Sequence, residues 1–132
     1  MATIRREIHI QAAPEKVWDA MRDVGALHTR LCPEFVTDTK MEGSDARLVT
    51  FANGRQAREL IVSVDDASRR LCWAIVDEPF VHYNGAAHLT ALSDGTCRFT
   101  WVSDLLPNEL EPTVTAMIEA GIAAIKRAQE AA

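Results

Sequence analysis

The sequence lacks the patterns that mark secreted and membrane-spanning proteins. Its three cysteines, Cys32, Cys72 and Cys97, are odd in number and show no CxxC spacing, whereas small secreted domains usually carry an even disulfide set. The N-terminal residues include no apolar stretch fit for a signal peptide. No run approaches the roughly 18 apolar residues that a membrane helix requires. We therefore expect a cytoplasmic protein in a reducing compartment, without membrane insertion.

Basic clusters and cofactor motifs are missing as well. The formal net charge is -5, and acids and bases are interleaved, so we expect no nucleic-acid partner, because phosphate binding depends on clustered Lys and Arg. No Gly-rich phosphate loop, nucleophile elbow or HExxH motif is present, and we predict no cofactor. His28 and Cys32 lie one helical turn apart, but no second pair has zinc-like spacing, so we predict no metal site.

What is present is the composition of an ordinary globule. The 132 residues are 48% hydrophobic and 25% charged, which suffices for one core without metals or disulfides. No repeat, low-complexity segment or Gly/Ser linker divides the chain, and we predict a single domain over residues 1–132. The sequence leaves open whether the protein is a monomer or a homodimer joined through exposed sheet edges.

Hydrophobic periodicity predicts an α+β fold. A strand is expected at 4–11, followed by a helix opened by Pro14 and a second short helix at 26–32. Six strands joined by short turns follow at 35–41, 46–52, 56–64, 70–76, 81–92 and 96–103, and Asn53-Gly54 is the strongest hairpin signal. From Glu111, apolar residues recur at helical spacing for about 20 residues, which makes a helix near 30 Å long. This order predicts a seven-stranded antiparallel sheet with helices on one face.

Small residues at inward positions raise the question of a cavity. Along 81–92, Tyr83, Gly85, Ala87 and Leu89 share one face, and the polar residues between them face water. Glycine in a strand often marks the close approach of another group, and Gly121 costs roughly 1 kcal/mol against alanine in a helix. Two interpretations remain open: a ligand-accessible cavity, or a core filled by Trp73, Trp101 and Phe51, which are the large aromatic residues opposite.

The strand at 56–64 has two plausible inward faces. Leu60, Val62 and Val64 form one, and Glu59 lies on the other with Ile61 and Ser63. Simple hydrophobic counting puts Glu59 outside, on a solvated face. If it lies inside, a carboxylate in an apolar interior has a raised pKa or needs a partner.

Five groups of residues along the chain carry a family resemblance. They are Ala13-Pro14-Glu15-Lys16-Val17-Trp18; Gly43-Ser44 with Arg47-Leu48-Val49-Thr50-Phe51; Asn53-Gly54 with Arg58-Glu59; Asp65-Asp66 with Arg69-Arg70-Leu71 and Trp73; and Phe99-Thr100-Trp101 with Pro107. In this order the chain resembles the START-like (SRPBCC) superfamily, especially its bacterial polyketide cyclase/dehydrase-like branch and the plant abscisic-acid receptors. The resemblance implies a helix-grip fold, in which a curved sheet wraps a long C-terminal helix around a cavity for hydrophobic ligands.

The resemblance also implies a set of cavity-lining positions and places Glu59 inside, where Tyr83 is a candidate hydrogen-bond partner. The implied lining is Val49, Phe51, Glu59, Ile61, Trp73, Ile75, Tyr83, Gly85, Ala87, Phe99, Trp101, Met117, Ile118, Gly121, Ile122 and Ile125. The receptors use longer, mobile loops as a gate, whereas the Asn53-Gly54 turn is too tight to serve as one. The only remaining gate candidate is the loop at 77–80.

Three functions are compatible with these features. The first is binding of a small hydrophobic, ring-containing molecule of polyketide-like or lipid-like character in the cavity. The second is an enzyme of the cyclase/dehydratase kind, for which Glu59 and Tyr83 are the best catalytic candidates. The third is a partner-binding module like the chaperone-activator relatives, which no residue pattern favours.

Overall fold

The computed structural model describes residues 1–131, and its order of elements confirms the predicted α+β class. The elements are β1 (Ala2–Ile10), α1 (Pro14–Arg22), η1 (Leu27–Leu31), β2 (Val36–Met41), β3 (Ala46–Phe51), β4 (Gln56–Asp65), β5 (Arg70–Ile75), β6 (His82–Ala91), β7 (Cys97–Leu106), η2 (Asn108–Leu110) and α2 (Glu111–Glu130). The largest shift of a strand boundary is at the end of β7, which continues three residues beyond its expected end at 103.

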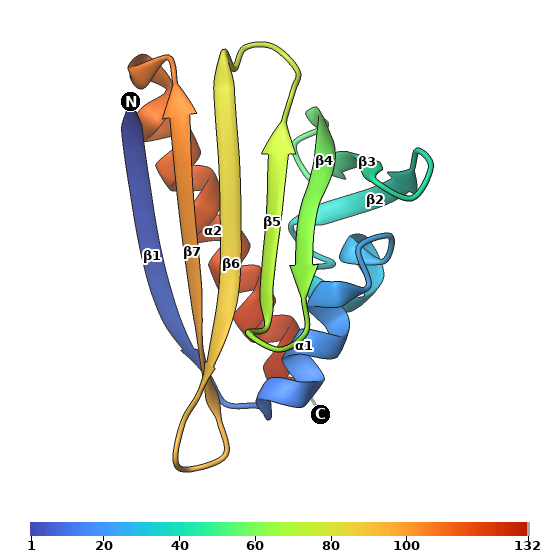
Figure 1. Cartoon of the computed structure of the whole chain (residues 1–132), viewed down its shortest axis with the longest axis vertical. Helices are drawn as coiled ribbons and strands as arrows, with labels where there is room; N and C mark the ends of the chain where they lie inside the picture. The colour runs from blue at the N-terminus through green and yellow to red at the C-terminus, as the bar shows by residue number, and fades with distance from the viewer. Residues whose placement is uncertain (132) are drawn as a thin grey trace.

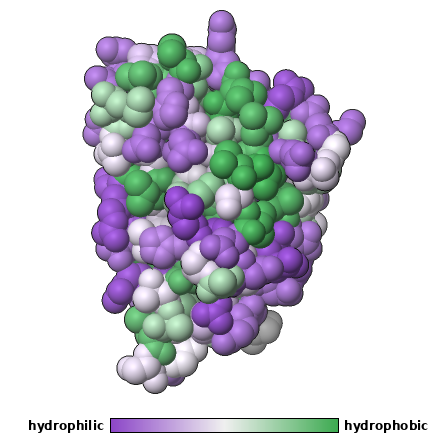
Figure 2. Space-filling model, in the orientation of Figure 1, coloured by the Kyte–Doolittle hydropathy of each residue, from purple (hydrophilic) through white to green (hydrophobic). Residues whose placement is uncertain are grey.

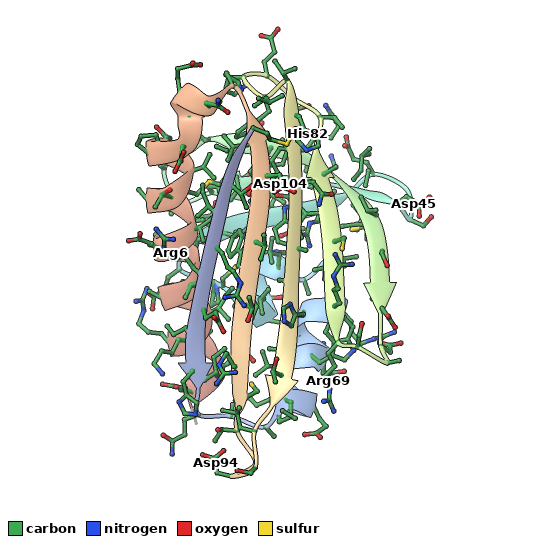
Figure 3. The ribbon with its side chains drawn as sticks, turned by 60° about the vertical axis from the view of Figure 1, so that its left-hand side comes forward. Arg6, Asp45, Arg69, His82, Asp94 and Asp104 are labelled. Carbon is green, nitrogen blue, oxygen red and sulfur yellow. The ribbon has the colours of Figure 1, made fainter. Side chains whose placement is uncertain are left out.

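A single antiparallel sheet contains all seven strands, in the order β1-β7-β6-β5-β4-β3-β2. The sheet curves around α2, which lies behind it in Figure 1, while α1 lies at the lower end of the sheet and η1 packs against β2. Figure 3 shows side chains from the sheet and from α2 filling the space between them. The predicted helix-grip fold is therefore confirmed.

The two α-helices bury the faces that their periodicity predicts. In α1, Pro14 occupies the first turn and Val17 and Met21 point into the core. In α2, Ile118 and Ile125 are almost completely buried along one side of the helix. Because side chains three and four residues apart share one helix face, such spacing determines which side meets the sheet.

The short helix predicted at 26–32 is present as η1, a single wide turn of π-helix at Leu27–Leu31. Its characteristic bond runs from the Cys32 amide to the carbonyl of Leu27, five residues earlier, at 3.0 Å. Leu31 and Cys32 are buried by this turn. The wide turn places both side chains toward the sheet immediately before Pro33, whose ring disfavours a helical residue before it.

Hydrophobic counting was wrong about β4, because its more apolar face is the exposed one. Leu60, Val62 and Val64 are 41%, 59% and 38% exposed, whereas Glu59 is 5% exposed. Figure 2 shows apolar side chains gathered over β4 and β5 on the outer face of the sheet. The inward orientation of Glu59 follows from its partner across the hairpin, described below. The predicted phase of β6, with Tyr83 inside, is confirmed.

Candidate functional site

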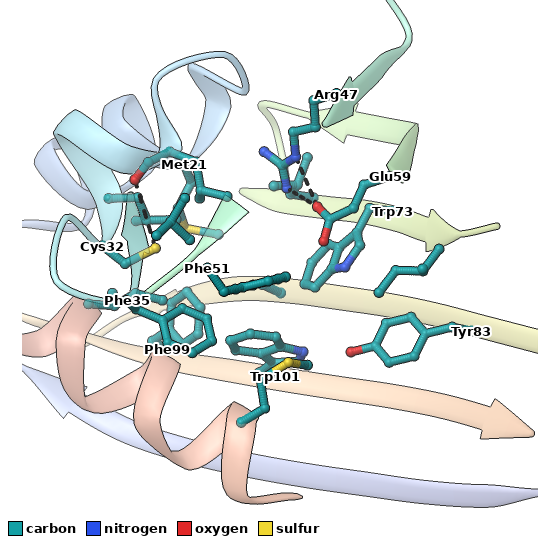
Figure 4. A pocket seen from close by; sticks show the side chains of 18 residues that line it. Met21, Cys32, Phe35, Arg47, Phe51, Glu59, Trp73, Tyr83, Phe99 and Trp101 are labelled. Atoms are coloured by element: carbon teal, nitrogen blue, oxygen red, sulfur yellow. Dashed lines mark hydrogen bonds and ion pairs between the residues drawn. The ribbon is translucent and has the colours of Figure 1, made fainter. Parts of the chain in front are cut away.

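A small cavity lies between the inner face of the sheet and α2 (Figure 4). Its volume is about 50 Å³, and since one water molecule needs roughly 10–15 Å³ of such volume, it has room for a few waters at most. Most of the wall is apolar. The lining residues are Met21, Leu27, Leu31, Cys32, Phe35, Val36, Arg47, Phe51, Glu59, Leu71, Trp73, Ile75, Tyr83, Ala87, Phe99, Trp101, Met117 and Ile125.

A larger groove opens on the outside of the molecule beside this cavity, with a volume of about 820 Å³. Its walls are the β3–β4 turn, the loop at 77–80 and the first half of α2. Four side chains, Phe35, Phe51, Ile75 and Met117, line both the groove and the cavity. We call these four residues the partition. The Phe35 and Phe51 rings meet edge to face, with centroids 5.3 Å apart.

A buried ion pair forms the polar part of the cavity wall. Arg47 and Glu59 are direct cross-strand partners in β3 and β4, and they are 3% and 5% exposed. Arg47 Nε and Nη2 both lie 2.9 Å from Glu59 Oε1, and Arg47 Nη1 donates to the carbonyl of Val24 at 3.0 Å. The other oxygen of Glu59 points away from Arg47 toward the cavity (Figure 4).

The Tyr83 hydroxyl belongs to a second polar group on the opposite strands. It lies 2.8 Å from Ser103 Oγ, which also accepts a hydrogen bond from Trp101 Nε1 at 3.0 Å. Burial raises the pKa of Tyr83, and the negative charge of Glu59 raises it further. Tyr83 therefore remains a neutral phenol at neutral pH. The structure gives Glu59 and Tyr83 different partners, so the predicted bond between the two is absent from the contacts within residues 1–131.

Two tryptophans explain the glycines that the sequence left open. A Cβ atom at Gly85 would lie 2.5 Å from the Trp73 ring, and one at Gly121 would lie 3.1 Å from the rings of Phe35 and Trp101. Trp73 and Trp101 contact each other with centroids 5.5 Å apart. At both glycines, the filled-core interpretation is the one that the structure supports, because aromatic rings occupy the space that a side chain would need.

The predicted lining residues divide into two groups. Those that line the cavity are Phe51, Glu59, Trp73, Ile75, Tyr83, Ala87, Phe99, Trp101, Met117 and Ile125. Those that lie elsewhere are Val49, Ile118 and Ile122 in the core, Gly85 and Gly121 beneath aromatic rings, and half-buried Ile61 on β4. Whether any of them contacts a ligand stays a prediction.

Sequence reasoning missed the part of the wall formed by α1, η1 and the adjoining strands. The missed residues are Met21, Leu27, Leu31, Cys32, Phe35, Val36, Arg47 and Leu71. The hairpin signal at Asn53-Gly54 came within one residue of indicating Arg47: a two-residue turn there would pair Leu48 with Glu59, whereas the hairpin closes at Phe51 and Arg55 and pairs Arg47 with Glu59. No comparable signal existed for the residues of η1, whose orientation depends on the wide turn.

The cysteine and histidine side chains near the cavity show no arrangement for nucleophilic or metal chemistry. Burial raises the pKa of the Cys32 thiol to about 12, so it stays protonated and unreactive at neutral pH. His28 Nε2 lies 3.9 Å from Asp38. Within residues 1–131, no three His, Cys, Asp or Glu side chains come together as a metal site would require.

Comparisons with known proteins identify relatives of the whole chain. The model of a family described as "Polyketide cyclase / dehydrase and lipid transport" matches residues 1–130. Among solved structures, the XoxI protein of Bacillus cereus is 18% identical, with a TM-score of 0.85, and the match covers 98% of this chain and 96% of that one. The di-domain ARO/CYC protein BexL, from the BE-7585A biosynthetic pathway, is 17% identical with a TM-score of 0.81, covering 97% of this chain and 46% of that one.

A plant enzyme shares the fold too. Norcoclaurine synthase from Thalictrum flavum is 16% identical, with a TM-score of 0.76, and the match covers 96% of this chain and 91% of that one. No curated protein matches by sequence. At these identities the structural likeness shows the fold alone. None of the helices within residues 1–131 is both long and apolar enough to span a bilayer.

Proposed function

This chain belongs to the polyketide cyclase/dehydrase and lipid transport family, and from that premise we propose that it binds a small hydrophobic, ring-containing molecule between the sheet and α2. The ligand is of polyketide-like or lipid-like character. The observation that carries the proposal is the partition: four apolar side chains separate an open groove from a cavity with a buried ion pair in its wall.

The volumes indicate how the site would admit a ligand. The groove, at about 820 Å³, falls within the usual range of small-molecule sites of ~300–1,000 Å³. The cavity, at about 50 Å³, is smaller than the ~150 Å³ cavity that is known to accept a benzene ring. A ring therefore enters when partition side chains move. Phe51 and Met117 are suited to this, because both are only half-buried and the Met117 side chain has three rotatable bonds.

Native mass spectrometry of the purified protein tests the proposal. We expect a fraction of the protein to carry a co-purified lipophilic molecule of a few hundred daltons, which is released on denaturation. Adding hydrophobic ring compounds should change the fluorescence of Trp73 and Trp101, which line the cavity. If no molecule co-purifies and no ring compound changes the fluorescence, the proposal fails.

A variant of the partition tests the route of entry. Phe51→Ala removes a ring that separates groove from cavity, so we expect ring compounds to bind faster by stopped-flow fluorescence. Leu60→Ala is the control, because Leu60 lies on the outer face of β4 and lines neither space. Equal association rates for Phe51→Ala and the unaltered protein would show that ligands enter elsewhere.

A second candidate function, catalysis of the cyclase/dehydratase kind, is favoured by the two polar groups that face the cavity. A free oxygen of Glu59 can accept a proton from a carbon beside a carbonyl, and the neutral phenol of Tyr83 can donate a hydrogen bond to the carbonyl oxygen. Glu59→Gln separates this function from simple binding. If the variant retains the co-purified molecule and converts it as the unaltered protein does, the catalytic role of Glu59 is excluded.

A further inference from the structure

We propose that the ligand of this cavity, whose existence rests on the proposed binding function, is electrically neutral and carries a hydroxyl group that donates a hydrogen bond to the free oxygen of Glu59. Arg47 acts as a positioning residue: it holds one carboxylate oxygen and leaves the other directed into the cavity (Figure 4).

The charges at the site favour a neutral ligand. Every nitrogen of Arg47 has a partner, two on Glu59 and one on the carbonyl of Val24. An anionic ligand would therefore compete with Glu59 and Val24 for the guanidinium of Arg47 and would meet the negative oxygen of Glu59. A cationic ligand would add a net charge beside a pair that is already balanced. An unbalanced charge in an apolar interior carries a large desolvation cost.

The hydrogen-bonding capacity of the wall favours a donor on the ligand. A carboxylate oxygen only accepts hydrogen bonds, and Glu59 directs one toward the cavity. Trp101 Nε1 and the Tyr83 hydroxyl both contact Ser103, and among the lining residues within 1–131 Glu59 is the only one with a carboxylate. A ligand without a donor would displace water from the Glu59 oxygen and give it no partner in return.

Three matched probes test the proposal by isothermal titration calorimetry at pH 7. The probes are 2-naphthol, 2-methoxynaphthalene and 2-naphthoate, which share one ring system and differ in donor and charge. We expect 2-naphthol to bind roughly tenfold to hundredfold more tightly than 2-methoxynaphthalene, as a hydrogen bond to a charged acceptor typically allows. We expect 2-naphthoate to bind most weakly of the three.

The possible outcomes separate the inference from the function on which it rests. If 2-methoxynaphthalene binds as tightly as 2-naphthol, or 2-naphthoate binds more tightly, the inference is overturned while hydrophobic binding stands. If none of the three binds, the proposed function and the inference fall together.

A variant of Glu59 tests which atom recognises the hydroxyl. In Glu59→Gln, the amide oxygen is the only group that can face Arg47, so the amide NH2 faces the cavity and replaces an acceptor by a donor. We expect the preference for 2-naphthol to fall by about tenfold or more, with 2-methoxynaphthalene affinity changed by less than about threefold. Glu42→Gln is the matched control, because Glu42 pairs with Arg58 on the surface, and its preference should stay unchanged.

A double variant keeps the test valid if Glu59→Gln fails to fold. Arg47→Met with Glu59→Leu removes both charges together, a change that buried ion pairs often tolerate. We expect it to bind 2-methoxynaphthalene and 2-naphthol with similar affinity. A preference for 2-naphthol that persists in either Glu59 variant would overturn the assignment.

Discussion

Replacing Gly85 by alanine tests whether the glycine serves tryptophan packing or ligand space. The new Cβ atom would lie 2.5–2.9 Å from three atoms of the Trp73 indole, which is closer than real side chains approach. The ring cannot yield easily, because it is buried and contacts Trp101. We therefore expect Gly85→Ala to displace Trp73 from its position in the cavity wall.

The magnitude follows from two opposing effects. Overpacking a core typically costs about 1–3 kcal/mol, whereas alanine in place of glycine within a strand contributes about 0.5–1 kcal/mol of stability. A contact of 2.5 Å places the overpacking cost in the upper half of its range, so the net loss of stability is about 1–2.5 kcal/mol, which for a domain of this size lowers Tm by roughly 3–10 °C. Differential scanning calorimetry measures the loss, and near-UV circular dichroism reports the altered tryptophan environment.

A double-variant cycle identifies the clashing partner. When Trp73 is replaced by leucine, the added Gly85→Ala change should cost much less than it does in the presence of the tryptophan. Gly121→Ala serves for comparison: there a Cβ atom would lie 3.1 Å from two rings, and the helix propensity of alanine offsets part of the crowding. Full stability of Gly85→Ala with an unchanged near-UV spectrum would refute the packing explanation and restore the ligand-space interpretation.

Three further outcomes are expected from urea unfolding. Arg47→Leu leaves Glu59 buried without its partner and should lower the unfolding free energy by about 3–5 kcal/mol. Replacing Glu59 by leucine in the same chain should recover most of that loss. If the double variant is as unstable as Arg47→Leu alone, the loss does not come from the unpaired charge of Glu59. The thiol of Cys32 has its pKa raised by burial from 9.0 to about 12, so the unfolded chain releases this proton first. The free energy of unfolding should then fall by about 1 kcal/mol between pH 8 and pH 10 because of this group, and the fall should be smaller by that amount in Cys32→Ala. If the unaltered protein and Cys32→Ala lose the same stability over this pH range, Cys32 is not the group responsible. Leu105→Ala should cost about 2–5 kcal/mol because Leu105 is fully buried, and Leu60→Ala less than about 1 kcal/mol; a larger loss for Leu60→Ala would mean that the outer face of β4 is covered.

Regular elements with strong periodicity were the most predictable part of the molecule. The apolar spacing from residue 111 onward predicts α2, and the alternation around Tyr83 predicts which side of β6 is buried. Both follow from local geometry, since a helix repeats its faces every 3.6 residues and a strand every second residue. The wide turn η1 has no such repeat, and its buried side chains therefore escaped prediction.

The periodicity of apolar residues along the sequence determined the fold class of this protein: an antiparallel sheet, a long C-terminal helix and a core between them. Tertiary structure alone decided how the interior is used. It turned Glu59 inward because Arg47 lies opposite it in the hairpin, and it placed the Trp73 ring over Gly85. The physical reason is the separation in sequence between the residues that interact. Periodicity is a property of neighbours along the chain, whereas charge pairing and ring packing depend on residues that only the folded sheet brings into contact.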